Sequence, residues 1–209
     1  MVEFIEVVKT FGKNRVLDGV NFRIASNTIN QIVGDQSTGK STILKMIYGA
    51  VKPDSGYIRV FDSNVSDLSY SGVVLLRRYI GIIFEDIRLI KDLTVKENIS
   101  VVTKMTKRNL YISEDIFDRL SIGYLLDKYP EELSLSEQSL VNIARGIVFN
   151  FPLVLADEPL RYLSLQYKQR VIELFKFLNK EKGITFLITS QSVLDEEFNI
   201  VDVNLNEKR

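Results

Sequence analysis

Cysteine and histidine are both absent from the 209 residues of this chain. Without thiols the chain can form no disulfide framework, no thiolate metal site and no cysteine nucleophile. Without imidazole it has no histidine acid, base or metal ligand. Any chemistry must therefore rest on carboxylates, hydroxyls, lysines and backbone amides.

An excess of charge of either sign is also lacking, because 27 lysines and arginines balance 27 aspartates and glutamates. The strong positive field that draws proteins to nucleic acid is not expected, so we predict no nucleic-acid partner. The contents of 45% hydrophobic and 26% charged residues are typical of a globular chain that buries a core. The length predicts a single domain, residues 1–209.

Long hydrophobic runs are missing as well. The longest stretch without a charge, Gly183 to Leu194, has 12 residues, whereas a transmembrane helix needs roughly 20. The first residues, MVEFIEVVKTF, lack the basic start, apolar core and cleavage site of a signal peptide. The sequence therefore predicts a cytoplasmic location.

Hydrophobic periodicity predicts strands and helices in alternation. The first thirty residues alternate in the β manner and predict two or three antiparallel strands, and the alternation of strands with helices that follows is typical of a parallel core sheet. Because the pattern is helical from residue 94 to 133, we expect a helical insertion, approximately residues 86–150. The further predicted strands are Asn30–Val33, Tyr57–Phe61, Tyr79–Phe84, Leu153–Ala156 and, as the last, Ile184–Thr189; the predicted helices are Thr42–Tyr48 and Leu165–Lys180, stopped by Gly183.

A phosphate-binding motif lies between a predicted strand and a predicted helix. Gly34 to Ser41 read GDQSTGKS, which matches G-x-x-x-x-G-K-[ST]. In such a loop backbone N–H groups surround phosphates, Lys40 reaches the β and γ phosphates, and Ser41 binds Mg²⁺. A glycine-rich turn with a chance Lys-Ser pair is the alternative. The predicted nucleotide-binding residues here are Gly34, Asp35, Gln36, Ser37, Thr38, Gly39, Lys40, Ser41 and Thr42.

An acidic motif, LVLADE, follows 116 residues after the phosphate loop. It is a buried apolar strand that ends in two carboxylates, Asp157 and Glu158. Asp157 could bind Mg²⁺ through water, and Glu158 could act as the general base for an attacking water molecule. The alternative is a strand that ends in solvated acids.

Several segments together resemble the ATP-binding subunits of ABC transporters, over essentially the full length. Besides the phosphate loop they are LLRRYIGIIFEDIRLIKDLTVKEN (75–98), ELSLSEQSLVNIARGIV (132–148), ADEPLRYLS (156–164) and LITSQ (187–191). The arginine pair and the IRLIKDLTV stretch are most similar to the FtsE branch, which is related to the lipoprotein-release and macrolide-export ATPases. The resemblance implies an α/β P-loop NTPase, an ABC-type nucleotide-binding domain with an antiparallel β-subdomain and a helical insertion.

The resemblance also implies partners and further site residues. Two subunits of such a family enclose two ATP molecules head to tail, so a homodimer is expected in the ATP-bound state, with Ser134 and Glu137 of one subunit facing the phosphate loop of the other. Phe11 would stack on adenine, unless it is an ordinary core residue, and Glu85 would bind Mg²⁺. The groove beside Glu85 to Lys91 would receive a helix of an integral membrane subunit of FtsX type, which would hold the chain at the inner face of the membrane; a plain surface loop is the alternative.

The sequence departs from the family pattern at positions that act between subunits or on the γ-phosphate. The signature L-S-G-G-E-Q reads LSLSEQ, so Leu135 and Ser136 replace glycines. If these positions need a positive φ, leucine there costs about 1–2 kcal/mol, and its side chain crowds the phosphate. Glu85 replaces a glutamine and adds negative charge, and Ser190 replaces the switch histidine.

Two smaller departures complete the pattern. The loop after the acidic strand reads RYLS (161–164) where the family has Gly-x-Leu-Asp, and Ser37 stands where many relatives have glycine. The residues that hold nucleotide within one subunit are kept. We therefore expect ATP binding with weakened hydrolysis.

Three functional hypotheses follow from this combination. The first is an FtsE-like ATPase subunit, slow in hydrolysis, that acts with a membrane partner in cell division and control of cell-wall hydrolysis. The second is a pseudo-ATPase, an ATP-binding switch or scaffold, and the third is a subunit of a lipoprotein or macrolide exporter. A soluble ABC protein of DNA repair or translation would need coiled-coil insertions or a second ATPase half, and a small P-loop kinase would need an arginine-bearing lid.

Overall fold

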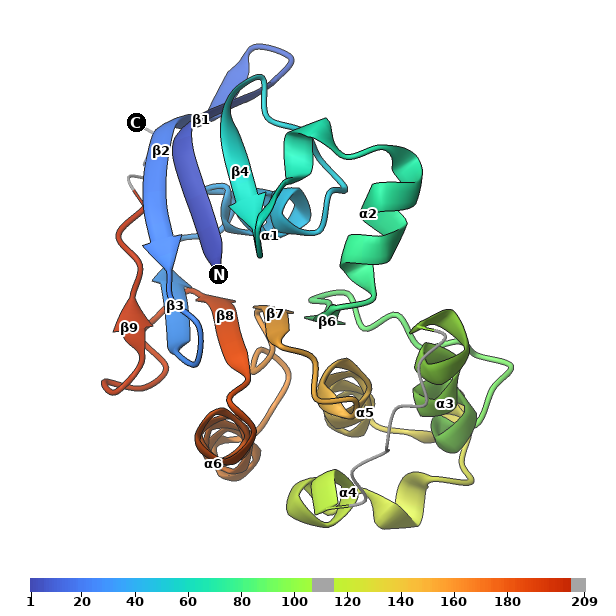
Figure 1. Cartoon of the computed structure of the whole chain (residues 1–209). Coiled ribbons are helices and arrows are strands. Elements are labelled where there is room, and N and C mark those ends of the chain that lie inside the picture. The colour runs from blue at the N-terminus through green and yellow to red at the C-terminus, as the bar shows by residue number, and fades with distance from the viewer. Residues whose placement is uncertain (107–114, 204–209) are drawn as a thin grey trace.

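Two β-sheets and the helices packed on them make up the computed structural model, which describes residues 1–106 and 115–203 (Figure 1). One sheet is antiparallel with the strand order β2-β1-β4-β5, and the other has the order β6-β7-β8-β3-β9 with every pair parallel. The strands are β1 (Val2–Phe11), β2 (Asn14–Ile24), β3 (Ile29–Val33), β4 (Ser55–Val60), β5 (Ser63–Asn64), β6 (Ile80–Ile83), β7 (Leu153–Asp157), β8 (Thr185–Ser190) and β9 (Asn199–Ile200). The α-helices are α1 (Lys40–Ile47), α2 (Tyr70–Arg77), α3 (Val95–Thr106), α4 (Asp115–Leu120), α5 (Leu135–Ile147) and α6 (Leu165–Lys182).

The predicted parallel core sheet is confirmed. β3 lies between β8 and β9, and β7 lies between β6 and β8. Four of its strands, β3, β6, β7 and β8, are mostly buried on both faces, which explains why their segments are rich in apolar residues, whereas the edge strand β9 is exposed.

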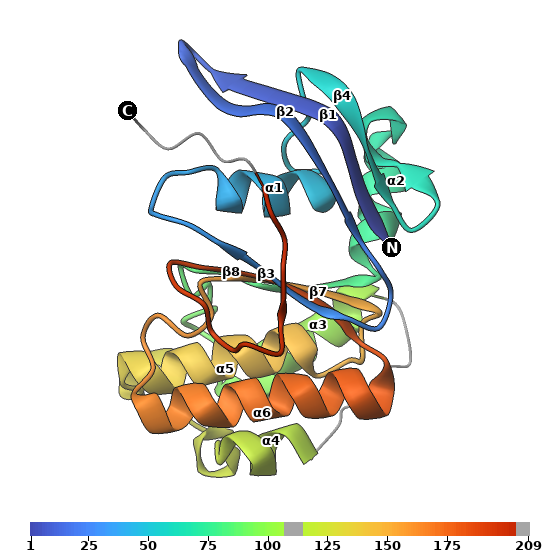
Figure 2. The ribbon, with the colours of Figure 1, turned by 90° about the vertical axis from the view of Figure 1, so that its left-hand side faces the viewer.

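Two hydrophobic cores lie on opposite faces of the parallel sheet. Leu153 and Leu155 of β7 point into the core shared with α1 and the antiparallel sheet, whereas Val154 and Ala156 point into the core formed with α3, α4, α5 and α6. The split follows from strand geometry, because successive side chains alternate between the two faces. Figure 2 shows the resulting layers, with α1 between the sheets and α5 and α6 beneath the parallel sheet.

Helix α5 packs unusually close to β6. A Cβ atom added at Gly81 would lie 2.1 Å from the Gly146 carbonyl oxygen, and one added at Gly146 would lie 2.5 Å from the Ile83 side chain. Only glycines allow this approach. Helix α5 thus contacts the parallel sheet through β6 and also packs against α3 and α4. The assignment of approximately residues 86–150 to one helical subdomain remains a proposal.

Two elements differ from the sequence-based expectation. The expectation that the strand ending at Thr189 is the last one is wrong, since β9 pairs with β3 after it. Two residues are too few to show a periodicity. Helix α2 was not expected, because with Leu76 as its one buried residue it shows no clear apolar face in the sequence. It begins after the N-cap Ser69, whose hydroxyl oxygen accepts a hydrogen bond from the Gly72 N–H (3.2 Å).

The end of α6 agrees with the prediction. Gly183 follows the helix with φ of 66°, and its N–H donates to the Asn179 carbonyl oxygen. Across residues 1–106 and 115–203, no helix has both the length and the apolar character that crossing a bilayer requires.

Candidate nucleotide-binding site

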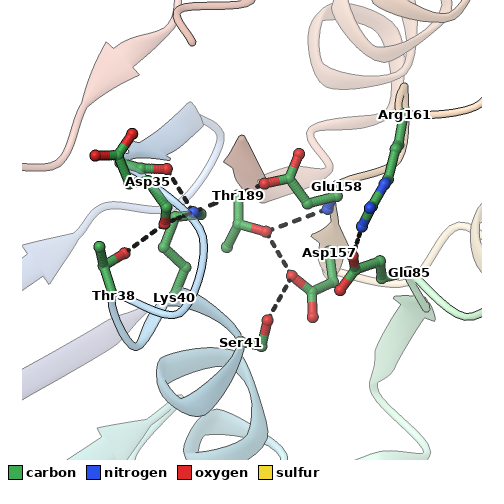
Figure 3. A network of polar contacts seen from close by, with 10 residues as sticks. Asp35, Thr38, Lys40, Ser41, Glu85, Asp157, Glu158, Arg161 and Thr189 are labelled. Carbon is green, nitrogen blue, oxygen red and sulfur yellow. Dashed lines mark hydrogen bonds and ion pairs between the residues drawn. The ribbon is translucent and has the colours of Figure 1, made fainter. Parts of the chain in front are cut away.

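The ends of three parallel strands place the candidate site. β3 leads into the loop before α1, β7 ends at Asp157 and β8 ends at Ser190. The Gly34 N–H donates to the Ser190 carbonyl oxygen (3.1 Å), which ties the phosphate loop to the end of β8. Figure 3 shows the side chains that meet there. Carboxyl ends of parallel strands are the usual place for a ligand site in such a sheet.

The loop has a backbone shape suited to an anion. Ser37 has φ of 64° and Gly39 has φ of 107°, and a Cβ atom at Gly39 would lie 2.8 Å from Val16 Cγ1. The N-terminus of α1 has no side-chain cap, so its first N–H groups remain available to phosphate oxygens. The Thr38 hydroxyl donates to the Asp35 carbonyl oxygen (2.9 Å) and braces the loop.

Lys40 lies inside this loop. Its ammonium group donates to the carbonyl oxygens of Gly34 (2.5 Å) and Asp35 (2.7 Å), and its Nζ is 3.7 Å from Glu158 Oε1. The residue is only 5% exposed. A buried cation held between the loop and a carboxylate is well placed to meet the terminal phosphates of a nucleotide.

Ser41 and Asp157, two of the predicted magnesium ligands, are in contact. The Ser41 hydroxyl donates to Asp157 Oδ1 (3.0 Å), and the Thr189 hydroxyl donates to the same oxygen (2.6 Å). In the described part of the chain, no group of three or more acidic side chains is arranged to hold a metal ion. This donor set fits Mg²⁺, which is usually held by one or two protein groups together with phosphate oxygens and water.

Glu85, the third predicted magnesium ligand, is paired with a cation instead. Its carboxylate accepts a hydrogen bond from the Arg161 guanidinium (Figure 3). It nevertheless lines the same hollow as the phosphate loop. The site thus has Glu85 at its edge and not in the Ser41 and Asp157 cluster.

Glu158, the predicted general base, sits on a strained backbone. Its φ is 45°, and its N–H donates to both the carbonyl and the hydroxyl oxygen of Thr189 (3.2 Å each). Burial raises the pKa of the Glu158 carboxyl group above its ordinary value, Asp157 and Glu85 add to the rise, and Lys40 and Arg161 oppose it. A raised pKa brings a carboxylate closer to the value that suits a general base near neutral pH.

The cavity over the loop has a volume of about 190 Å³. Pockets that enclose a whole small ligand measure roughly 300–1,000 Å³, so this one fits the phosphates and leaves the rest of a nucleotide outside. Its lining residues are Val16, Gln36, Ser37, Gly39, Lys40, Ser41, Thr42, Glu85, Glu158 and Gln191.

Phe11 does not line this cavity. It ends β1 beside the hairpin turn, is 48% exposed, and lies 5.4 Å from the Lys9 ammonium measured to the ring centroid. In Figure 2 the tip of this hairpin lies on the same side of the molecule as the loop before α1. Its exposure differs from that of an ordinary core phenylalanine, and its stacking on adenine remains a proposal.

Ser134 and Glu137 also lie outside the cavity and form a capping box at the start of α5. The Ser134 hydroxyl donates to Glu137 Oε2 (2.7 Å) and accepts from the Glu137 N–H (3.3 Å), while the Tyr124 hydroxyl donates to Glu137 Oε1 (2.8 Å). Ser134 would have to exchange its bond to Glu137 before donating to a partner subunit's phosphate.

The expectation that Leu135 adopts a strained left-handed backbone is wrong. Leu135 and Ser136 are the first residues of α5, and neither has a positive φ. The N-cap Ser134 starts the helix directly, so a residue with a side chain fits without backbone cost. The expectation that the side chain of Leu135 crowds a phosphate remains a prediction, because Leu135 is 53% exposed.

Ser37 does carry the strain that Leu135 lacks. Because its φ is 64°, replacement by glycine should remove a left-handed penalty of about 1 kcal/mol and raise the free energy of unfolding by up to that amount. Chemical denaturation of Ser37→Gly measures this change, with the exposed Ser55→Gly of β4 as the matched control. A lower free energy of unfolding in Ser37→Gly would contradict the prediction.

Sequence reasoning missed several contacts of the site. Thr189 bonds to Asp157, Arg161 pairs with Glu85, and Val16 and Gln191 line the cavity. The signal for Thr189 was its place at the end of the predicted buried strand Ile184–Thr189, because the ends of parallel strands gather at one edge of a sheet. The opposite charges of the two unusual residues Glu85 and Arg161 were the signal for their pairing.

The sequence matches the ABC transporter family over residues 17–161. It is 33% identical over 201 residues to the cell division ATP-binding protein FtsE of Escherichia coli, covering 92% of this chain and 89% of that protein. It is 30% identical over 192 residues to the lipoprotein-releasing system ATP-binding protein LolD of Cytophaga hutchinsonii, covering 90% and 88%. The chain spans 60–62% of the length of the methionine import ATP-binding proteins MetN of Caulobacter vibrioides and Clostridium tetani.

A solved structure gives the same assignment. The dimeric, post-hydrolysis structure of the ATP-binding cassette MJ0796 with ADP and Pi superposes with a TM-score of 0.84 at 28% identity, covering 92% of this chain and 88% of that one. The fold, the phosphate loop with Lys40, and the contact between Ser41 and Asp157 agree with these matches. The chain therefore belongs to the ABC transporter family, as an ABC-type ATPase domain that binds ATP with Mg²⁺.

Proposed function

We propose that this chain is the ATP-binding subunit of a membrane complex of the FtsE/FtsX kind, which couples ATP binding and slow hydrolysis to cell division and control of cell-wall hydrolysis. The observation that carries this proposal is the completeness of the site within one subunit. Lys40 lies in the loop, Ser41 bonds to Asp157, and Glu158 lies beside Lys40. The similarity to FtsE supports the choice of branch.

Slow hydrolysis is proposed because the residues that would act on the γ-phosphate from outside this core are altered. Ser190 is 3% exposed, and its hydroxyl has no hydrogen-bond partner among the described residues. Serine is also shorter than histidine and carries no charge. Ser134 itself is retained, but its hydroxyl donates to Glu137. Each lost contact to a developing charge costs about 3–4 kcal/mol in typical enzymes, although such losses do not add.

We propose that the ATP-bound state is a homodimer, since the similar cassette MJ0796 is described as dimeric. We further propose that an integral membrane subunit of FtsX type holds the chain at the inner face of the membrane. A groove of about 170 Å³ beside Glu85, with Tyr48, Phe84 and Arg88 in its walls, would receive a helix of that subunit. Ile90 of the adjoining segment is 43% exposed, whereas Leu89 packs against the core formed with α3, α4, α5 and α6.

The pseudo-ATPase remains the second candidate. The pairing of Glu85 with Arg161 and the buried position of Ser190 favour it, because both remove groups that would act on the γ-phosphate. The retention of Glu158 beside Lys40 favours an ATPase. A nucleotide-binding subunit of a lipoprotein or macrolide exporter is the third candidate, supported by the similarity to LolD.

The choice between complexes can be tested by reconstitution. We expect the ATPase rate of this chain to rise when it is purified with a membrane subunit of FtsX type, because that partner would bring two copies together. The same measurement with a membrane subunit of a lipoprotein-release system is the control. Stimulation by the second subunit alone would replace the proposed complex by an exporter.

Restoring the family residues should raise turnover. The variant Leu135→Gly, Ser136→Gly and Ser190→His should hydrolyse ATP about tenfold faster or more, because it returns close backbone approach and a γ-phosphate contact. The matched control carries alanine at the same three positions and should show no gain. The measurement is steady-state phosphate release at saturating MgATP. An unchanged rate would mean that hydrolysis is limited elsewhere.

A further inference from the structure

Two departures from the family pattern meet in space. Glu85 follows β6 and Arg161 follows β7, 76 residues further along, yet their side chains form an ion pair (Figure 3). Both side chains are 36% exposed. Each substitution alone would change the charge of the site, whereas together they leave it unchanged.

The backbone after β7 holds Arg161 in this position. The Arg161 N–H donates to the Glu158 carbonyl oxygen (3.2 Å), and the Leu163 N–H donates to the Leu160 carbonyl oxygen (3.2 Å). Leu160 and Leu163 are both buried. These two leucines anchor the turn in the core. The side chain of Arg161, which lies between them in the sequence, extends to Glu85.

The Glu85 carboxylate lies where a triphosphate would feel its charge. It lines the cavity over the phosphate loop together with Lys40, and it lines the adjoining groove together with Ser41 and Asp157. With Asp157 and Glu158, it makes three carboxylates at the end of the nucleotide site. Lys40 and Arg161 are the cations that act on the Glu158 carboxyl group. Loss of Arg161 would remove the cation paired with Glu85 and leave that carboxylate without this partner beside a polyanion.

We propose that Arg161 is a positioning residue for the terminal phosphates of ATP. Its guanidinium neutralises Glu85 and directs that carboxylate away from the phosphates, so that the pair replaces an uncharged glutamine. The inference rests on the proposed function and adds to it a pair of residues that acts as one unit.

A purely structural role for the pair predicts different behaviour. Partly exposed ion pairs contribute little to folding stability, so a structural pair would leave nucleotide affinity almost unchanged when broken. An electrostatic role instead makes the loss of Arg161 harmful only while Glu85 keeps its charge. The two roles are therefore separated by a double-mutant cycle.

The experiment measures the dissociation constant of ATP for the full chain and for Arg161→Ala, Glu85→Gln and the double variant, with Mg²⁺ and with EDTA. We expect Arg161→Ala to weaken binding about tenfold and Glu85→Gln in that background to restore it to within about threefold of the original. The loss should be larger in EDTA, where no metal offsets the carboxylate, and smaller at high salt. Arg161→Lys, which keeps the charge, should retain most of the affinity.

The matched control is Arg119→Ala. Arg119 is 39% exposed and pairs with Asp115 (3.3 Å) on α4, away from the nucleotide site, so its loss should leave the dissociation constant unchanged. Thermal unfolding of every variant verifies that it is folded. An equal loss in Arg161→Ala and in the double variant, or no loss in either, overturns the inference. Absence of ATP binding in the unmodified chain contradicts the proposed function itself.

Discussion

Lys40→Ala is expected to weaken MgATP binding by about a hundredfold or more. The Lys40 ammonium is buried, and it is the cation that the phosphate loop folds around. Removal of one partner from a buried, hydrogen-bonded charge pair costs about 2–5 kcal/mol, and 1.4 kcal/mol corresponds to a factor of ten. Titration with MgATP by calorimetry measures the dissociation constant.

The control for this prediction is Lys180→Ala. Lys180 is an exposed lysine in the last turn of α6, on the opposite side of the parallel sheet from α1. Its loss removes the same charge from the chain without touching the loop. An unchanged affinity in Lys40→Ala would mean that nucleotide binds elsewhere and would refute the placement of the site.

Glu158→Gln is expected to reduce ATP hydrolysis by about a hundredfold or more while MgATP binding is retained. The amide has nearly the same shape as the carboxylate but cannot take a proton from water. The substitution leaves the backbone bonds to Thr189 in place, because these involve the Glu158 N–H. Steady-state phosphate release measures the effect in the chain purified with its membrane partner, with Glu173→Gln on the exposed face of α6 as the control.

The pH dependence of the ATP hydrolysis rate is a second test of the proposed role of Glu158. Burial raises the pKa of Glu158, and the base acts only as the carboxylate, so the rate should rise with pH through this raised pKa and level off above it. Below the raised pKa the protonated acid cannot accept the proton of water, so activity should be lost. Equal rates and pH profiles in the chain and in Glu158→Gln, with MgATP still bound, would instead identify an ATP-bound switch or scaffold.

Two residues of the candidate site have a strained backbone. Ser37 and Glu158 both have a positive φ, which costs energy in residues other than glycine. For Ser37 glycine would remove the cost at no chemical loss. The proposed role of Glu158 as general base needs its carboxylate, and the hydrogen bonds to Thr189 hold its strained backbone in place.

The sequence by itself determined the features that depend on contiguous residues. The continuous apolar run Leu153–Ala156 predicts a buried strand and the motif Gly34–Ser41 predicts a phosphate loop, and both are present. The physical reason is that a strand and a tight loop are built from neighbouring backbone units, so their residue types appear side by side in the chain.

Only the tertiary structure decided which distant residues meet. The strand order β6-β7-β8-β3 brings Asp157 beside Thr189 and Ser41, and the turn after β7 brings Arg161 to Glu85. It also decided that Leu135 starts a helix without strain. Contacts between distant residues depend on the order of strands in the sheet, which the spacing of no single motif encodes, whereas the capping box at Ser134 and Glu137 that starts this helix is a local pattern.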